Sequence, residues 1–302
     1  MLNVVQSFGE RLPTACQNTH QEAWAVFEPF IAKYGSEYPI CERTTRVLRQ
    51  GLTFFGSAIL SIAPAVLSRM GASFEATGFS SYLWLAGKLV GRFGDEENLA
   101  LRAAFKDVYE RSSNKMVAIL QEKSPQMIPD GKSPLLFMLR QIADAVIVME
   151  DYLQMLLQMI EFTPDIFFPS PAFAIAFRVA MAGLTLVYSD IAYAAIDLLR
   201  MIIAHDCLAP SSQPPPPKFP IYANAIRPVV EQEGATMTGY LLSGIVGDFP
   251  EESIHMVVTI FRVLSSLWPT QLLVWLPPAI QQLPSASAPD AAKAAFITEM
   301  NR

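Results

Sequence analysis

Apolar residues along most of the chain recur every three or four positions, the spacing of one face of an α-helix. The period-two alternation that is typical of β-strands is hard to find anywhere in the sequence. The pattern therefore predicts about a dozen helices joined by loops. The segments with helical spacing are residues 23–34, 41–55, 80–93, 96–121, 135–148, 151–162, 172–187, 191–204, 221–230, 237–246, 253–267 and 271–281.

Proline and glycine separate these segments. The predicted breaks are residues 35–39, 71–78, 124–133, 164–171, 209–220, 247–250 and 268–269. The break at 209–220 contains Pro214 to Pro217 in a row, and it is predicted to be a stiff surface loop in the polyproline conformation. A motif for a proline-binding module is the alternative for this loop. Residues 285–302 are predicted to be a C-terminal tail in which a short helix at 291–300 acts as a cap.

Many of the predicted helices are apolar around more than half of their circumference, so they must be covered on most sides. Residues 191–204, for example, carry only Asp197 and Arg200 as charges. A two-layer stack of antiparallel helix pairs provides this cover, because each pair packs on the pairs before and after it. Pair lengths of about 40 residues are typical of HEAT-type repeats. We therefore predict an all-α fold, an α-solenoid of about six HEAT-like repeats that forms a single segment over residues 1–302.

The composition leaves a membrane protein as an alternative, because 52% of the residues are hydrophobic, only 17% are charged, and the mean hydropathy is +0.30. The longest uncharged stretch, residues 51–68, approaches the length of a membrane span, but Gly56 and Pro64 mark a break inside it. Other apolar stretches contain charges that are costly in a bilayer, such as Asp144 within residues 141–161. A polytopic membrane protein is therefore the least favoured interpretation.

The net charge of −6 and a pI near 5.2 argue against nucleic acid as a direct partner, since phosphate backbones bind basic surfaces. Cys16, Cys41 and Cys207 are too few and too scattered for a disulfide framework, and they fit a reducing compartment. The N-terminus lacks the cationic run and the apolar core of a secretory signal.

The sequence contains none of the common catalytic or nucleotide-binding motifs, neither a phosphate-binding loop, a dinucleotide fingerprint, a zinc-protease motif nor a nucleophile elbow. His20, His205 and His255 stand far apart, and none has a second ligand at metal-binding spacing. The run His205-Asp206-Cys207 is predicted to be structural, because neighbours in sequence point in different directions. We therefore expect no enzyme, no cofactor and no metal.

One cluster stands out, because Arg43, Arg46 and Arg49 recur every three residues. At about 100° per residue they span roughly 120° of the helix surface. The residues expected on the opposite, buried side are Thr44, Leu48, Leu52 and Phe55. In an acidic protein, a row of guanidinium groups attracts carboxylates and especially phosphates. The alternative is a solvated face with local ion pairs, for instance to Glu42 or Glu37.

Three stretches of the chain, in this order, resemble one family of proteins. They are E-R-x-x-R-x-L-R at residues 42–49, VMEDYLQMLLQMIEFTPDIFFPS at residues 148–170, and the segment from Gly234 through WPTQLLVWLPPAIQQLP at residues 268–284. Their order and spacing are similar to those in the C-terminal part of a β-karyopherin, a nuclear import receptor of the transportin-SR and importin-thirteen (mRNA transport regulator) subgroup. The resemblance covers residues 38–284.

This resemblance implies a solenoid that carries RNA-binding and serine/arginine-rich proteins into the nucleus and shuttles between nucleus and cytoplasm. By position, Arg43, Arg46 and Arg49 match the helix that binds phosphorylated cargo in transportin-SR. Residues 51–54 (GLTF) stand where that helix has a further arginine, which implies fewer contacts with phosphate in this chain.

The family binds the GTPase Ran through N-terminal repeats, which we expect to lie outside this chain, and nucleoporins are candidate partners. Neither direct nucleic-acid binding nor membrane binding is expected. The second interpretation is a helical-repeat scaffold for protein–protein interaction without a transport role.

Overall fold

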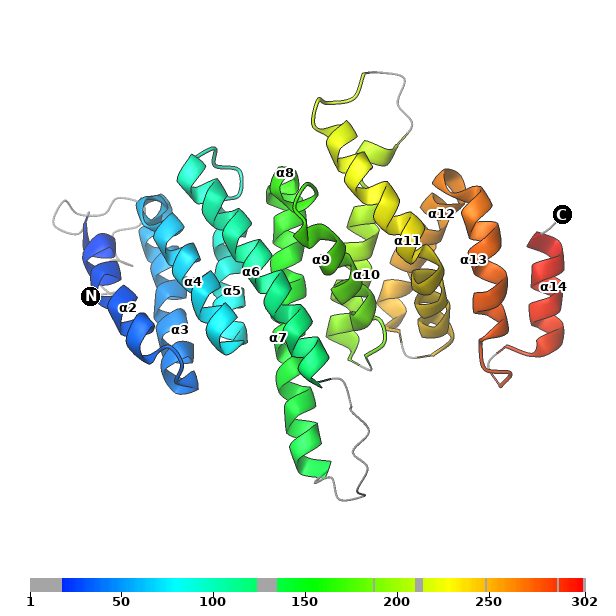
Figure 1. The fold of residues 1–302 in the computed structure, drawn as a ribbon, viewed down its shortest axis with the longest axis horizontal. Helices are drawn as coiled ribbons and strands as arrows, with labels where there is room; N and C mark the ends of the chain where they lie inside the picture. Colours follow the sequence, from blue (N-terminus) through cyan, green and yellow to red (C-terminus); the bar gives the residue numbers. More distant parts are fainter. Residues whose placement is uncertain are drawn as a thin grey trace. The chain divides into compact units, whose positions relative to one another are not determined.

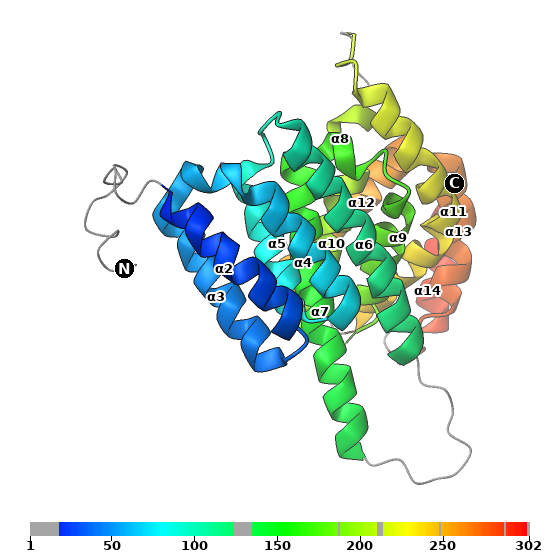
Figure 2. The same cartoon turned by 60° about the vertical axis from the view of Figure 1, so that its left-hand side comes forward.

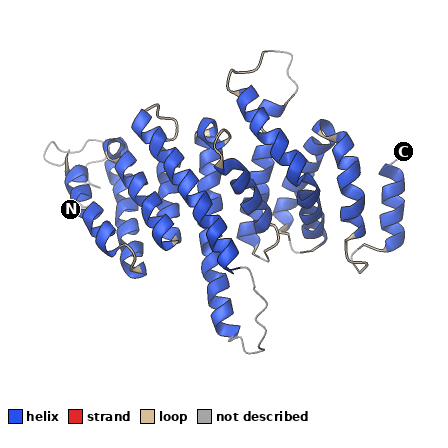
Figure 3. Cartoon of the chain, viewed as in Figure 1, coloured by secondary structure: helices blue, strands red, loops and turns tan. Residues whose placement is uncertain are grey.

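The computed structural model describes residues 18–123, 135–186, 188–209, 214–247, 249–286 and 288–300. All regular elements in these ranges are helices and none is a strand (Figure 3), which confirms the predicted all-α fold class. The chain divides into two compact units, residues 1–172 (unit 1) and 173–302 (unit 2). Cys16, the predicted break at 124–133, and residues 210–213 of the predicted proline-rich loop lie outside the described residues.

Unit 1 is a stack of helix pairs. Its elements are α2 (Thr19–Tyr34), α3 (Tyr38–Phe55), the 3₁₀ helix η2 (Gly56–Ser61), α4 (Ala63–Thr77), α5 (Ser80–Phe93), α6 (Leu99–Lys123), α7 (Leu135–Phe162) and α8 (Pro164–Phe167). Helices α2, α4 and α6 lie side by side in one layer, and α3, α5 and α7 form the other (Figures 1 and 2). Consecutive helices thus alternate between the layers, as they do in repeats of antiparallel helix pairs.

Unit 2 repeats this arrangement. Its elements are α9 (Ala172–Gly183), α10 (Ser189–Ile203), η3 (Asp206–Leu208), α11 (Phe219–Val246), η4 (Glu251–Ser253), α12 (Ile254–Leu267), α13 (Pro269–Gln281) and α14 (Asp290–Met300). Helix α10 packs on α12, and α11 packs on α13, so these helices again contact the next but one, whereas α14 contacts α13. Helix α14 lies in the predicted tail, residues 285–302. The single segment of about six repeats stays a prediction.

The structure corrects the predicted break at residues 71–78. Helix α4 was not predicted, and Gly71 lies inside it instead of ending it. A Cβ atom at Gly71 would lie 3.4 Å from the Cα atom of Val108 on α6, so the missing side chain lets the two helices approach closely. The helix ends at Thr77, and Gly78 follows it in the left-handed conformation with φ 73°.

Two pairs of predicted helices are continuous in the structure. The predicted segments are 135–148 with 151–162, which belong to α7, and 221–230 with 237–246, which belong to α11. Within α11, Gly234 does not break the helix but makes room for Trp275 of α13, whose ring would lie 2.3 Å from an added Cβ atom. Pro228 also lies inside α11. Packing between helices, which the local pattern does not reveal, decides the continuity of α11.

Helix α5 lies between α3 and α7 in unit 1 and is buried on most sides. Its buried side chains include Tyr82, whose hydroxyl donates a hydrogen bond to the carbonyl of Gly35 at 2.8 Å. The residues that remain partly or fully accessible form one stripe along the helix, and they are Ser81, Trp84, Lys88, Gly91 and Arg92. The core of unit 1 therefore fixes which face of α5 a partner can reach.

Arginine–carboxylate pairs connect neighbouring helices along one layer of unit 1. They are Glu28–Arg69 between α2 and α4, Arg111–Glu75 (2.6 Å) between α6 and α4, and Arg102–Asp165 (2.5 Å) between α6 and α8. Among the described residues of the other layer, α3, α5 and α7, no ion pair joins two helices. Among the described residues, the arginines of the two layers are therefore used differently.

Within the described ranges, no single helix is both long and apolar enough to cross a membrane. The segments Tyr38–Ser61 and Ala63–Thr77 pass that test only when they are taken together, by length and composition, and they are bent by 111° where they meet.

Candidate functional site

The three arginines of the predicted row lie on α3, and all three side chains are exposed. The opposite side of the helix is buried through Cys41, Thr44 and Thr45. The Thr45 hydroxyl satisfies its hydrogen-bonding need inside the helix by donating to the Cys41 carbonyl at 2.9 Å, so a polar residue is tolerated on the buried face. The division of α3 into a packed and an arginine-bearing face thus follows the helical spacing.

The members of the row differ in their partners. The Arg46 guanidinium lies 2.6 Å from the Glu42 carboxylate one turn earlier, and both side chains are largely exposed (60% and 44%). This is the local ion pair that the sequence offered as the alternative for the row, and such exposed pairs stabilise a helix only by about 0.3–0.5 kcal/mol. Arg43 and Arg49 have no carboxylate within 4.0 Å among the described residues. The row therefore keeps two unpaired guanidinium groups.

Arg49 reaches from α3 to the accessible stripe of α5. Its Cζ atom lies 4.7 Å from the ring centre of Trp84, and the Nζ atom of Lys88 lies 5.4 Å from a Trp84 ring centre. These residues line an open cleft of about 420 Å³ together with Leu52, Thr53 and Arg92. Leu48, Leu52 and Phe55 were predicted on the buried side of α3, and the prediction is wrong because all three are only half-buried. Leu52 lines this cleft, and Leu48 and Phe55 line a second cavity between α2 and α3.

Trp84, Lys88 and Arg92 were not predicted as site residues. They lie four residues apart on α5, so they share one helix face. That spacing is visible in the sequence as W-x₃-K-x₃-R. The sequence does not show that these residues lie near the arginine row. Helices α3 and α5 become neighbours only because consecutive helices alternate between the two layers.

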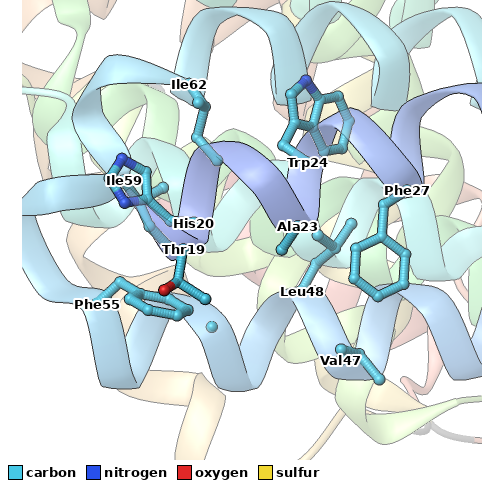
Figure 4. Close-up of a pocket in the computed structure, with 11 residues that line it drawn as sticks. Thr19, His20, Ala23, Trp24, Phe27, Val47, Leu48, Phe55, Ile59 and Ile62 are labelled. Atoms are coloured by element: carbon cyan, nitrogen blue, oxygen red, sulfur yellow. The ribbon is translucent and has the colours of Figure 1, made fainter. Parts of the chain in front are cut away.

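A second cavity, of about 180 Å³, lies between α2 and α3. In Figure 4, Trp24 and Phe27 of α2 flank it together with Val47 and Leu48 of α3. His20 also lines it and is held by Ser61, whose Oγ atom lies 3.0 Å from its Nε2 atom. The lining is almost wholly apolar, so this cavity offers no site for an anion.

The run His205-Asp206-Cys207 lies at the short helix η3 of unit 2, where His205 is the N-cap residue. The Nδ1 atom of His205 accepts a hydrogen bond from the backbone N–H of Cys207 at 3.1 Å, which caps the short helix η3. Burial lowers the pKa of His205, although Asp206 opposes this. Burial also raises the pKa of Cys207 to about 11, so the thiol stays protonated at neutral pH. In the parts of the chain that are described, no three His, Cys, Asp or Glu residues gather as metal ligands.

Residues 14–120 match the family model described as the transportin-3/importin-13 fourth TPR domain. The chain is also 20% identical to the uncharacterized protein C11G11.07 of Schizosaccharomyces pombe, over 93% of this chain and 28% of that protein. It is 30% identical to the mRNA transport regulator MTR10 of Saccharomyces cerevisiae, over 28% of this chain and 9% of that protein.

These comparisons support the resemblance to nuclear transport receptors of the transportin and importin group. The chain spans about a quarter of the length of the first relative and about a tenth of the second. The matched residues 14–120 include α3 and α5, and hence the arginine row and the cleft beside it. TPR and HEAT units are both repeats of helix pairs, so the family description agrees with the observed fold.

Proposed function

We propose that this chain is a cargo-binding segment of a nuclear import receptor. Its cargo is an RNA-binding or serine/arginine-rich protein, and Arg43, Arg46 and Arg49 bind acidic or phosphorylated groups on that cargo. One observation carries the proposal: two of these arginines are exposed and have no carboxylate partner among the described residues, on a helix inside the family-matched residues 14–120. The remaining segments of the receptor, including repeats that bind Ran, lie outside this chain.

The chemistry of the row suits phosphorylated cargo. A guanidinium group presents a planar fork of N–H donors that matches two oxygens of a phosphate or carboxylate. A phosphoserine carries a charge of about −1.5 to −2 at neutral pH, so it attracts an unpaired guanidinium more strongly than a carboxylate does. Several such contacts order a flexible cargo segment along α3. Because the net charge of the chain is −6, this row is a local exception in an otherwise acidic protein.

A receptor of this kind shuttles between cytoplasm and nucleus, and contacts with nucleoporins accompany its passage. Helix pairs stacked as one continuous segment of about six repeats present the cargo surface. We propose these properties for the whole receptor because of the likeness of this chain to transportin and importin receptors.

The test is charge reversal of two arginines in the full 302-residue chain, Arg43→Glu with Arg46→Glu. The control, Lys33→Glu with Lys106→Glu, changes the charge equally at two other exposed positions of unit 1. Binding of a fluorescein-labelled peptide with alternating arginine and phosphoserine is measured by fluorescence anisotropy. Hydrogen bonds between charged groups contribute about 1.5–3 kcal/mol each, so the double variant should bind at least about 100-fold more weakly.

Helicity by circular dichroism should be the same in the wild type and in both variants, because all four positions are exposed. Undiminished binding by the Arg43/Arg46 variant contradicts the proposed site. A wild-type chain that binds neither the phosphopeptide nor acidic peptides favours the scaffold interpretation instead.

A further inference from the structure

The cleft between α3 and α5 concentrates positive charge beside the arginine row. Arg49 enters it from α3, and Lys88 and Arg92 enter it from α5. None of these three side chains has a carboxylate within 4.0 Å among the described residues, and Lys88 and Arg92 are exposed. The cleft has a volume of about 420 Å³, whereas one water molecule occupies roughly 30 Å³ in the liquid. A phosphoryl group therefore fits in the cleft together with part of the peptide that carries it.

Among the arginines of unit 1 whose side chains are described, those without a carboxylate partner lie on this surface. In the described part of unit 1, the arginines that form ion pairs are Arg46, Arg69, Arg102 and Arg111. Among the arginines whose side chains the structure describes, those that form none are Arg43, Arg49 and Arg92, and all three lie on α3 and α5. Like charges that share a cleft repel one another, so an anionic ligand there relieves an existing cost.

Trp84 forms the aromatic wall of the cleft. A cation stacked on an indole ring at an exposed site gains only about 0.5–1 kcal/mol, so this contact does not by itself compensate for the absent carboxylates. Its consequence is geometric, because the indole ring holds the Arg49 guanidinium at the wall of the cleft. Trp84 is therefore a positioning residue, which acts on a bound anion through Arg49.

We propose that Arg49, Lys88 and Arg92, positioned by Trp84, form a distinct subsite for the phosphoryl group of one phosphoserine of the cargo. A carboxylate brings one negative charge, whereas a phosphoryl group brings nearly two and three acceptor oxygens, which suits a cleft with three cations. The inference rests on the proposed function, and it adds a second helix, α5, to the cargo surface. It predicts that phosphorylation raises affinity through Lys88 and Arg92 of α5 as well as through the arginine row.

The first test uses the full chain and a labelled peptide that carries a single phosphoserine, with serine and glutamate versions for comparison. The variant is Lys88→Ala with Arg92→Ala, and the matched control is Lys33→Ala with Lys106→Ala. We expect the variant to bind the phosphopeptide at least about tenfold more weakly and the control to bind like wild type. The preference for the phosphoserine peptide over the glutamate and serine peptides should be smaller in the variant than in the wild type. Equal phosphopeptide affinity of the variant and the wild type overturns the subsite.

The second test addresses Trp84. Trp84→Phe keeps an aromatic wall and should retain most of the affinity, whereas Trp84→Ala should lose about three- to fivefold. Loss by both variants to the same extent, or by neither, overturns the positioning role. Titration of the wild-type chain with free O-phosphoserine should change its tryptophan fluorescence, and the change should disappear in Trp84→Phe. Circular dichroism confirms that each variant is folded.

The same measurements separate this inference from the proposed function. If Arg43→Glu with Arg46→Glu loses the cargo peptide but Lys88→Ala with Arg92→Ala does not, the subsite is wrong and the arginine row stands. If free phosphoserine changes the fluorescence through Trp84 but the cargo peptide does not bind, the subsite is supported and the cargo role is contradicted.

Discussion

Glu42 is the acidic neighbour within the arginine row, and its replacement gives a prediction of unusual sign. Its carboxylate lies 2.6 Å from the Arg46 guanidinium, so it competes with the proposed cargo for the N–H donors of Arg46. Glu42→Gln keeps the shape of the side chain and removes its charge. Loss of an ion pair normally weakens a protein, but here we expect tighter binding of a phosphorylated peptide.

The expected gain follows from two contributions. Releasing Arg46 from an exposed pair one turn away returns about 0.3–0.5 kcal/mol. A phosphoryl group that accepts from Arg46 at about 2.8 Å lies roughly 5 Å from the Glu42 carboxylate, given the 2.6 Å pair distance. In water, and screened at physiological salt, its repulsion by that carboxylate amounts to about 0.7 kcal/mol. The sum is about 1 kcal/mol, or about a fivefold gain in affinity.

The assay is fluorescence anisotropy with the arginine–phosphoserine peptide at about 0.15 M and about 1 M salt. The gain should shrink toward unity at the higher concentration, where the screening length falls to about 3 Å. In an Arg46→Ala background, Glu42→Gln should improve binding less than about twofold, because no phosphoryl group is then held beside residue 42. Unchanged or weaker binding by Glu42→Gln at the lower salt concentration refutes a role for Arg46 in cargo capture.

Two further predictions concern the core of unit 1, and both are measured by urea unfolding followed by circular dichroism. The Tyr109 hydroxyl is buried without a hydrogen-bond partner among the described residues, whereas the Tyr152 hydroxyl lies 2.7 Å from the Ser113 hydroxyl. Tyr109→Phe should therefore be neutral or stabilising by about 1 kcal/mol, and Tyr152→Phe should destabilise by about 1 kcal/mol; the opposite order contradicts this reasoning. Burial raises the pKa of Asp151 to about 6, so the folded chain loses stability as the pH rises from about 4 to 6. Asp151→Asn should add on the order of 2 kcal/mol at pH 7.5 and nothing near pH 3.5, and an equal gain at both pH values contradicts the assignment.

The helices that could be predicted from the sequence are those whose apolar spacing is uninterrupted. Helix α4 was missed because Gly71 reads locally as a break, although its role is to allow close contact with Val108 of a later helix. In α11, the predicted segments end at residue 230 and resume at 237, although Gly234 between them lies inside the helix and accommodates Trp275. A glycine looks the same in the sequence whether it allows a turn of the chain or a close approach between two helices. The close approach becomes visible only when the partner helix is known.

The candidate site also has a part that the sequence predicts and a part that depends on the packing of helices. The exposure of Arg43, Arg46 and Arg49 follows from the rotation per residue within one helix, so spacing alone predicts it. The pair between Arg46 and Glu42 is also local, and the sequence contained it as an alternative. The cleft is not local, because it needs residues from two helices separated by α4. The misplacement of Leu52, by contrast, is local, because Leu52 follows Arg49 by three residues and the helical rotation already places it only about 60° from that arginine.

The use of charge in unit 1 links the fold to the proposed function. In the layer that contains α2, α4 and α6, arginines join neighbouring helices through carboxylates, so these charges serve the stack itself. In the described part of the layer that contains α3, α5 and α7, arginines of two adjacent helices face solvent without such pairs, and the one ion pair there lies within α3. Unpaired like charges add little to the stability of a stack, because they repel one another and the contact of Arg49 with Trp84 contributes only about 0.5–1 kcal/mol. Their gathering on one layer is therefore better explained by an anionic partner that binds across α3 and α5 than by the needs of the fold.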